Sequence, residues 1–190
     1  MILREDLPTY FLKPAELRFV RGPGVIRTVL GSCVTVTMFC RRLAASAACH
    51  PVLPACPEAG SCHVQNCSQR SKYVECVIPE MLRRFQDLGV QEDELEIKIF
   101  GGANMFFRST SQKEILQVGS RNVDMAKEMI KELRLTLKSY DVGGNQGRKL
   151  YFDTETGDVW VKRFQANGAS RDDLTVMQSQ LSLQLKNHER

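Results

Sequence analysis

Long apolar segments are absent from this sequence. Arg, Thr or Gly interrupts the apolar runs well short of the roughly 18 residues that a bilayer span requires. The first ten residues, MILREDLPTY, carry acidic side chains where a secretory signal peptide has its apolar region. We therefore expect a cytoplasmic protein that neither inserts into a membrane nor carries an export signal.

The chain also lacks a concentration of positive charge. Its net charge is only +4 over 190 residues, and Lys and Arg are scattered along it with no run of five or six. Nucleic-acid-binding domains gather such residues into a patch or stripe that neutralises phosphates. We therefore expect no nucleic acid among the partners of this protein.

A disulfide framework is not expected either. The chain has seven cysteines, an odd number, and thiols in the cytoplasm stay reduced. Catalysis, metal binding and simple packing are the alternatives for these residues. Histidine is scarcer, because the chain has only His50, His63 and His188.

Strands are predicted where short runs are rich in Val, Ile, Thr or small residues, and helices where apolar residues recur every three or four positions. The predicted strands are 25–30, 34–39, 43–50, 95–103 and 114–119, followed by a hairpin in which 148–153 and 158–164 flank the turn TETG. The predicted helices are 72–88, ending at Gly89, and 120–137. Residues 55–71 have no periodicity and predict a long surface loop.

The composition becomes polar near the C-terminus. We expect one domain over residues 1–165 and a polar tail over residues 166–190. Ser170 and Asp173 have the spacing of a capping box, which predicts a short helix, whereas the polar composition suits a disordered tail equally well. The apolar residues of such a helix are Leu174, Met177, Leu181 and Leu185.

Cys33 and His50 are the candidate catalytic pair. If the strands 34–39 and 43–50 pair antiparallel, Cys33 at the start of one comes beside His50 at the end of the next. A cysteine nucleophile needs such a base, and the backbone N–H groups of Gly31 and Ser32 are candidates to stabilise the developing oxyanion. A cysteine in a Val-rich strand is also commonly a small core residue, so packing is the alternative.

A second group of thiols and imidazole lies in the predicted loop. Cys56, Cys62, His63 and Cys67 provide enough ligands for a tetrahedral zinc site, but none of their spacings is the Cys-x₂-Cys of structural zinc knuckles. We therefore predict no metal and keep these four residues as weak candidates.

Two glycine-rich segments, GGAN at 101–104 and GGNQGR at 143–148, bear a superficial likeness to phosphate-binding loops. Neither has the Lys-Ser/Thr of a P-loop or the G-x-G-x-x-G spacing of a dinucleotide fold. We therefore predict that they form tight turns near a packed site.

Five separated blocks occur in an order that is specific to one family. They are RTVLGSCV (27–34), HPVLP (50–54), KIFGGANMF (98–106), VGSRNV (118–123) and VGGNQGRKLYFDTETGDVWVKR (142–163). Through these blocks the chain resembles the chemoreceptor glutamine deamidases of the CheD family. The cysteines of the loop after His50, and Cys40 where Asp is common, depart from the family pattern.

The resemblance implies a role for three residues: Cys33 as nucleophile, His50 as base and Thr28 as support for the histidine. It also implies an α+β fold of layered mixed β-sheets flanked by helices, related to glutamine-deamidating toxins. No metal or organic cofactor is implied.

The implied reaction converts glutamine side chains of chemoreceptor helices to glutamate through a Cys33 thioester, and the same route would open a glutamyl methyl ester. We expect a cation or a helix N-terminus to lower the pKa of the Cys33 thiol. The alternative function is a regulatory module that binds receptors or the chemotaxis phosphatase CheC, with the cysteine-rich loop as a metal or redox site.

Overall fold

The computed structural model describes residues 6–57, 67–104 and 117–164, together with residues 173, 175 and 178–180. Within these residues the strands are β1 (Thr9–Phe11), β2 (Leu17–Arg21), β3 (Val25–Leu30), β4 (Val34–Cys40), β5 (Ala45–Cys49), β6 (Leu95–Gly101), β7 (Leu137–Val142), β8 (Gly147–Asp153) and β9 (Val159–Phe164). The helices are α1 (Val74–Gln86) and α2 (Val118–Glu132). No helix in this part of the chain is long and apolar enough to cross a membrane.

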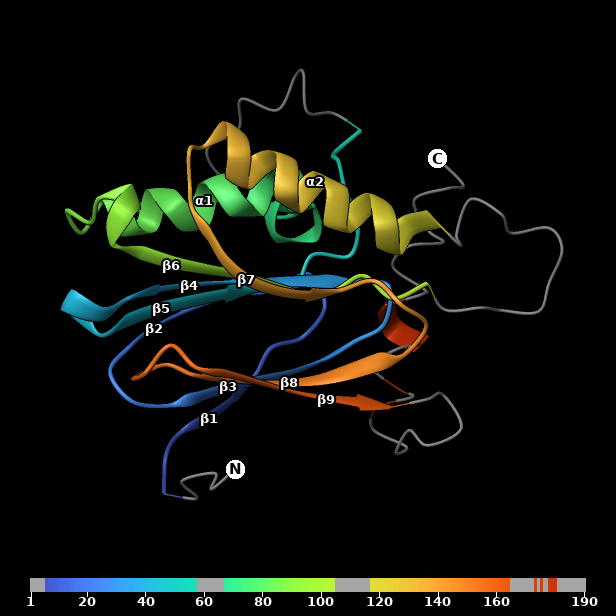
Figure 1. The fold of residues 1–190 in the computed structure, drawn as a ribbon, viewed down its shortest axis with the longest axis horizontal. Coiled ribbons are helices and arrows are strands. Elements are labelled where there is room, and N and C mark those ends of the chain that lie inside the picture. The colour runs from blue at the N-terminus through green and yellow to red at the C-terminus, as the bar shows by residue number, and fades with distance from the viewer. Residues whose placement is uncertain are drawn as a thin grey trace, which may run out of the picture.

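Two β-sheets and a helical layer are stacked on one another (Figure 1). The five-stranded sheet has the order β2-β5-β4-β6-β7, and the four-stranded sheet has the order β1-β3-β8-β9. Both sheets are mixed, because β1 is parallel to β3 and β6 is parallel to β7, whereas the other pairs are antiparallel. Helices α1 and α2 cover one face of the five-stranded sheet, and the four-stranded sheet covers the other. The predicted α+β class is confirmed.

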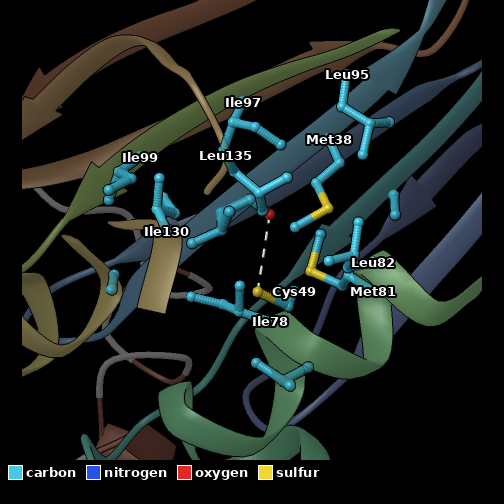
Figure 2. Close-up of a cluster of buried hydrophobic side chains, with 14 of the residues drawn as sticks. Met38, Cys49, Ile78, Met81, Leu82, Leu95, Ile97, Ile99, Ile130 and Leu135 are labelled. Carbon is cyan, nitrogen blue, oxygen red and sulfur yellow. Dashed lines mark hydrogen bonds between the residues drawn. The ribbon is translucent and has the colours of Figure 1, made fainter. Parts of the chain in front are cut away.

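Strand β4 lies in the middle of the five-stranded sheet. All seven of its residues are buried, because this sheet is covered on both faces. Val36 and Met38 point to the helices and Phe39 points to the second sheet, as the alternation of a strand requires. Figure 2 shows the helix side of this core, where Ile97 and Ile99 of β6 meet Ile78, Met81 and Leu82 of α1 and Ile130 of α2.

Most of the predicted elements are confirmed. Strands β3, β4 and β6, the β8–β9 hairpin and helix α1 correspond to the predictions from the sequence. Gly89 follows α1 with φ of +72°, the left-handed conformation expected of a glycine that ends a helix. Strand β5 begins at Ala45 rather than at residue 43, because Arg41–Leu43 form a 3₁₀ turn.

Three strands were not predicted, namely β1, β2 and β7. Each lies at an edge of its sheet, and of the four edge strands only β9, in the predicted hairpin, was predicted. An edge strand has a single neighbour and is partly exposed, so it lacks the continuous apolar run of a central strand. In β7, for example, Lys138, Ser139 and Tyr140 are exposed. The sequence pattern therefore reveals the interior of the sheets better than their edges.

Two predictions around α2 are wrong. The strand predicted at 114–119 is wrong at Val118 and Gly119, which begin α2, while residues 114–116 lie outside the described residues. The helix predicted to residue 137 ends at Glu132, because Arg134 takes a φ of 56° and Leu137 starts β7. Apolar residues continue through the turn between α2 and β7, since Leu135 still packs into the helix-side core. The sequence pattern therefore resembles that of a longer helix.

The described residues of the C-terminal tail are helical. Residues 173, 175 and 178–180 have helical backbone, and the choice between a short helix and a disordered tail over residues 166–190 stays a prediction. They lie between the two sheets at one end of the sheets, where Figure 1 draws them in red. Ser170 and the four apolar residues expected on this helix lie outside the described residues.

Candidate active site

The turn Gly31–Ser32–Cys33 joins β3 to β4 and is held by a second turn. The N–H of Gly102 donates to Cys33 O at 2.8 Å, and the N–H of Ala103 donates to Gly31 O at 2.9 Å. Gly101 has φ of +103°, and a Cβ there would lie 2.3 Å from Cys33 O. Glycine is therefore required for the two turns to approach this closely.

Asn122 of α2 holds the same turn from the helical layer. Its Nδ2 donates to Ser32 O at 3.1 Å and to Val52 O at 3.2 Å. One fully buried amide thus ties the segment that carries Cys33 to the segment that follows His50. The turn before β4 and the end of β5 are fixed relative to each other.

His50 follows β5 directly and lies on the side of the sheet that faces the second sheet. Val36 of β4 pairs with Cys49 of β5, and the two strands are antiparallel. When this register is extended by one residue, His50 lies opposite Thr35. Cys33 precedes Thr35 by two residues and therefore shares this face, as its packing in the core between the sheets confirms. Diagonal neighbours of this kind have Cα atoms roughly 7–8 Å apart, within reach of two side chains.

Thr28 of β3 determines which ring nitrogen of His50 carries a hydrogen. Thr28 Oγ1 lies 2.7 Å from Leu12 O and 2.8 Å from His50 Nδ1. The single hydroxyl hydrogen goes to the carbonyl oxygen, which can only accept. The second bond then requires a hydrogen on His50 Nδ1, which leaves a lone pair on Nε2. His50 is oriented to accept a proton at Nε2.

A glutamine from the C-terminal tail meets this lone pair. Gln180 Nε2 lies 2.6 Å from Val29 O and 3.2 Å from His50 Nε2, and the N–H of Gly31 donates to Gln180 Oε1 at 3.2 Å. The opposite orientation of the amide would set oxygen against oxygen at Val29, so the nitrogen faces His50. Gln180 is 2% exposed.

Burial controls the protonation of the candidate pair. Cys33 and His50 are both fully buried, and burial raises the pKa of the Cys33 thiol and lowers the pKa of His50 to about 4. In this closed arrangement the two groups are therefore a neutral thiol and a neutral imidazole near neutral pH. The expectation that the pKa of Cys33 is lowered is wrong for this arrangement.

The blocks that are separated in sequence meet around the Cys33 turn. The turn at 101–104 packs against it, and the turn at 143–144 joins through Gly143 N–H to Gly101 O at 2.9 Å and Asn104 N–H to Gly144 O at 2.8 Å. The two glycine-rich segments therefore form tight turns beside the candidate site, as predicted.

The cysteine-rich loop is described only at its ends. Cys56 and Cys67 form no disulfide with any described cysteine, and no group of three or more His, Cys, Asp or Glu in the described part of the chain is arranged for a metal ion. Cys62 and His63 lie outside the described residues, so a metal or redox role of this loop stays a prediction.

Two residues of the site were missed by sequence reasoning. Asn122 lies within the block VGSRNV, and a polar residue beside Val123 on the buried face of a predicted helix was the available signal. Gln180 lies in the polar tail, where nothing in the local pattern indicates a buried side chain.

Comparison with known proteins places the chain in a family. The family model described as "CheD chemotactic sensory transduction" matches residues 55–163. A protein of Geobacter sulfurreducens named "Probable chemoreceptor glutamine deamidase CheD 2" is 41% identical over 157 residues, which cover 83% of this chain and 91% of that protein.

Proteins named "Probable chemoreceptor glutamine deamidase CheD" match over similar lengths. That of Maridesulfovibrio salexigens is 37% identical over 163 residues, covering 85% of this chain and 95% of its own. The protein of Methanococcus vannielii is 32% identical over 152 residues, which cover 80% of this chain and 93% of that protein. The predicted resemblance is confirmed, and the chain belongs to the CheD family.

Proposed function

We propose that this protein deamidates glutamine side chains of chemoreceptors, with Cys33 as the nucleophile and His50 as the base. The observation that carries the proposal is a carboxamide in the site, whose nitrogen lies 3.2 Å from His50 Nε2 and whose oxygen accepts from the Gly31 N–H at 3.2 Å. The names of the relatives support the same reaction. The protein is accordingly a hydrolase of carboxamide C–N bonds.

The first half of the reaction forms a thioester. His50 Nε2 takes the proton of the Cys33 thiol as Sγ attacks the γ-carboxamide carbon of the substrate. The Gly31 N–H stabilises the oxyanion, in the role predicted for this backbone. Protonated His50 then gives its proton to the departing nitrogen, which leaves as ammonia.

The second half releases the product. His50 removes a proton from water, and the resulting hydroxide attacks the γ-glutamyl thioester. Cys33 leaves as thiolate and recovers the proton from His50, so that glutamate and the original enzyme remain. A glutamyl methyl ester reacts through the same thioester and loses methanol in place of ammonia.

Buried neutral groups suit this sequence of proton transfers. Because burial disfavours both the Cys33 thiolate and the protonated His50 ring, the ion pair forms only as the substrate carbon is attacked. Thr28 keeps the hydrogen of His50 on Nδ1, so Nε2 stays available for each transfer. Thr28 is a positioning residue.

The test is mass spectrometry of a receptor cytoplasmic fragment after incubation with the protein. Wild type should convert specific glutamines to glutamate, and Cys33→Ala should be slower by at least about a thousandfold, because the nucleophile is lost. If the wild type converts none, or Cys33→Ala converts as many, the proposal is wrong. Circular dichroism of both proteins controls for folding.

Thr28→Val provides a matched test within the same assay. It keeps the shape of Thr28 but removes the hydroxyl, so kcat should fall about 10- to 100-fold with little change in KM. Thr28→Ser restores a hydroxyl and should recover most of kcat. A Thr28→Val protein with the kcat of wild type would contradict the role of Thr28.

Binding to the phosphatase CheC stays a prediction from the family resemblance. It is checked separately, by a pull-down with the purified phosphatase. Tight binding by a protein that deamidates no receptor would favour the regulatory module.

A further inference from the structure

We propose that the C-terminal tail is a tethered competitor of the substrate, and that Gln180 occupies the subsite for the substrate carboxamide. This inference rests on the proposed function. Its consequence is that the tail of the enzyme controls whether a substrate glutamine reaches Cys33.

The contacts of Gln180 are those required of a substrate. The nitrogen that would leave as ammonia donates to His50 Nε2, the atom proposed to transfer protons, and the oxygen that would become the oxyanion accepts from the Gly31 N–H. Val29 O accepts the other hydrogen of the amide nitrogen at 2.6 Å. Every hydrogen of the Gln180 side-chain amide is used, so the subsite is selective for a carboxamide over a carboxylate.

An ion pair holds the same segment against the second sheet. Asp173 Oδ2 lies 2.7 Å from Lys149 Nζ of β8, and the carboxylate of Asp173 is almost fully buried. Asp173 and Gln180 are both buried, and the described residues of this segment have helical backbone. The segment therefore has an anchor in addition to the carboxamide.

The tail also accounts for the closed state of the site. Cys33 is 0% exposed and Gln180 2% exposed, so an external glutamine cannot reach the sulfur while Gln180 is bound. The occupant belongs to the same chain, so it competes at an effective concentration that dilution does not change. It also has the backbone conformation of the proposed substrate, a glutamine on a helix. Displacement of the tail is then a required step before external substrate binds.

The first test measures the reactivity of Cys33 in the full chain with iodoacetamide, which requires no knowledge of the substrate. Gln180→Ala should raise the alkylation rate of Cys33 by about tenfold or more, because three hydrogen bonds that close the site are lost. Gln178→Ala changes an exposed glutamine of the same segment and should leave the rate within about twofold of wild type. Cys40 and Cys49, buried in the sheet, serve as internal references that should stay unreactive in each variant.

A second variant tests the anchor. Asp173→Asn removes the ion pair with Lys149 but leaves the site untouched, and it should raise Cys33 alkylation by a smaller factor, about threefold. An unchanged Cys33 rate in both Gln180→Ala and Asp173→Asn would overturn the proposal.

The second test measures deamidation of the receptor fragment. Gln180→Ala should lower the apparent KM by the same factor by which it raises Cys33 alkylation, as expected when an intramolecular competitor is removed. If alkylation rises but no variant deamidates the fragment, the tail covers Cys33 but the proposed function fails. If wild type and Gln180→Ala both deamidate the fragment with the same KM, and their Cys33 alkylation rates are also the same, the proposed function holds and this inference fails.

Discussion

His50, the proposed base, is fully buried, and the hydrogen-bond partners of its ring among the described residues are a hydroxyl, a carbonyl and an amide. None of these carries a charge that would stabilise a protonated ring, so burial lowers its pKa to about 4. A histidine in this state is a proton acceptor at neutral pH. It has a large tendency to return the proton, which suits a group that must protonate a departing nitrogen.

The lowered pKa of His50 makes folding stability depend on pH. Between about pH 6.5 and 4 the unfolded chain binds a proton at this residue that the folded chain does not, so stability is lost as the pH falls through this window and is kept above it. From about pH 7 to pH 5 this loss amounts to about 2 kcal/mol. Urea unfolding at the two pH values measures it.

The matched control for this prediction is His50→Gln, which has no titrating group at position 50. Its unfolding free energy should fall by about 2 kcal/mol less than that of wild type over the same interval. Equal pH dependence of the two proteins would mean that the pKa of His50 is the same in the folded and unfolded chains, which would contradict the lowering of this pKa by burial.

At the scale of elements, the site depends on the contact between the end of β6 and the start of α2. Gly102 has φ of +66°, and a Cβ there would lie 2.3 Å from Val123 Cγ2 and 2.8 Å from Gly119 O. Its N–H holds Cys33 O at 2.8 Å. A side chain at this position would push α2 away from the turn that carries Cys33, the proposed nucleophile.

Gly102→Ala and Gly89→Ala separate this close contact from backbone strain. Gly89 has nearly the same φ, +72°, but nothing within 4 Å of a Cβ. Gly89→Ala should cost only the left-handed strain, about 1–2 kcal/mol, and Gly102→Ala should cost about 1–3 kcal/mol more because backbone must move. Urea unfolding of both variants gives the difference. If both variants lost the same free energy of unfolding, α2 would accommodate the added methyl group of Gly102→Ala without strain.

Sequence reasoning predicted the central elements and placed Cys33 and His50 beside each other, because buried strands leave local signals and antiparallel pairing follows from them. It could not establish the Nδ1 hydrogen of His50, since this follows from Leu12, a residue 38 positions away that accepts the Thr28 hydroxyl. It also could not identify Gln180, whose role depends on a contact with Gly31 across 149 positions. Contacts of this range are made by the fold and have no local pattern.

At the scale of the whole molecule, the central sheet belongs to two cores at once. One face packs against α1 and α2, and the other packs against the four-stranded sheet. Polar contacts join the two sheets as well: Ser46 Oγ donates to Thr154 O at 3.0 Å and Lys98 Nζ donates to Gly157 O at 2.6 Å. At the other end of the β8–β9 hairpin, Asp141 of β7 pairs with Arg148 at 2.9 Å.

Since the layers share one sheet, the domain predicted over residues 1–165 should unfold as one cooperative unit. The single tryptophan, Trp160, lies on β9 in the four-stranded sheet, and helices α1 and α2 lie in the opposite layer. Tryptophan fluorescence and far-ultraviolet circular dichroism therefore report on opposite sides of the molecule. Their transitions in urea should have the same midpoint and slope.

The variant Phe39→Leu tests more directly whether the two sheets unfold together. Phe39 is 1% exposed and packs between the sheets, so shortening it removes contacts only on the side of Trp160. It should cost about 1 kcal/mol, and in a single unit it moves the fluorescence and circular dichroism midpoints together. If only the fluorescence midpoint moved, the two sheets would be separate units, and Cys33, which precedes β4, and Thr28 of β3 would lie in units that unfold independently.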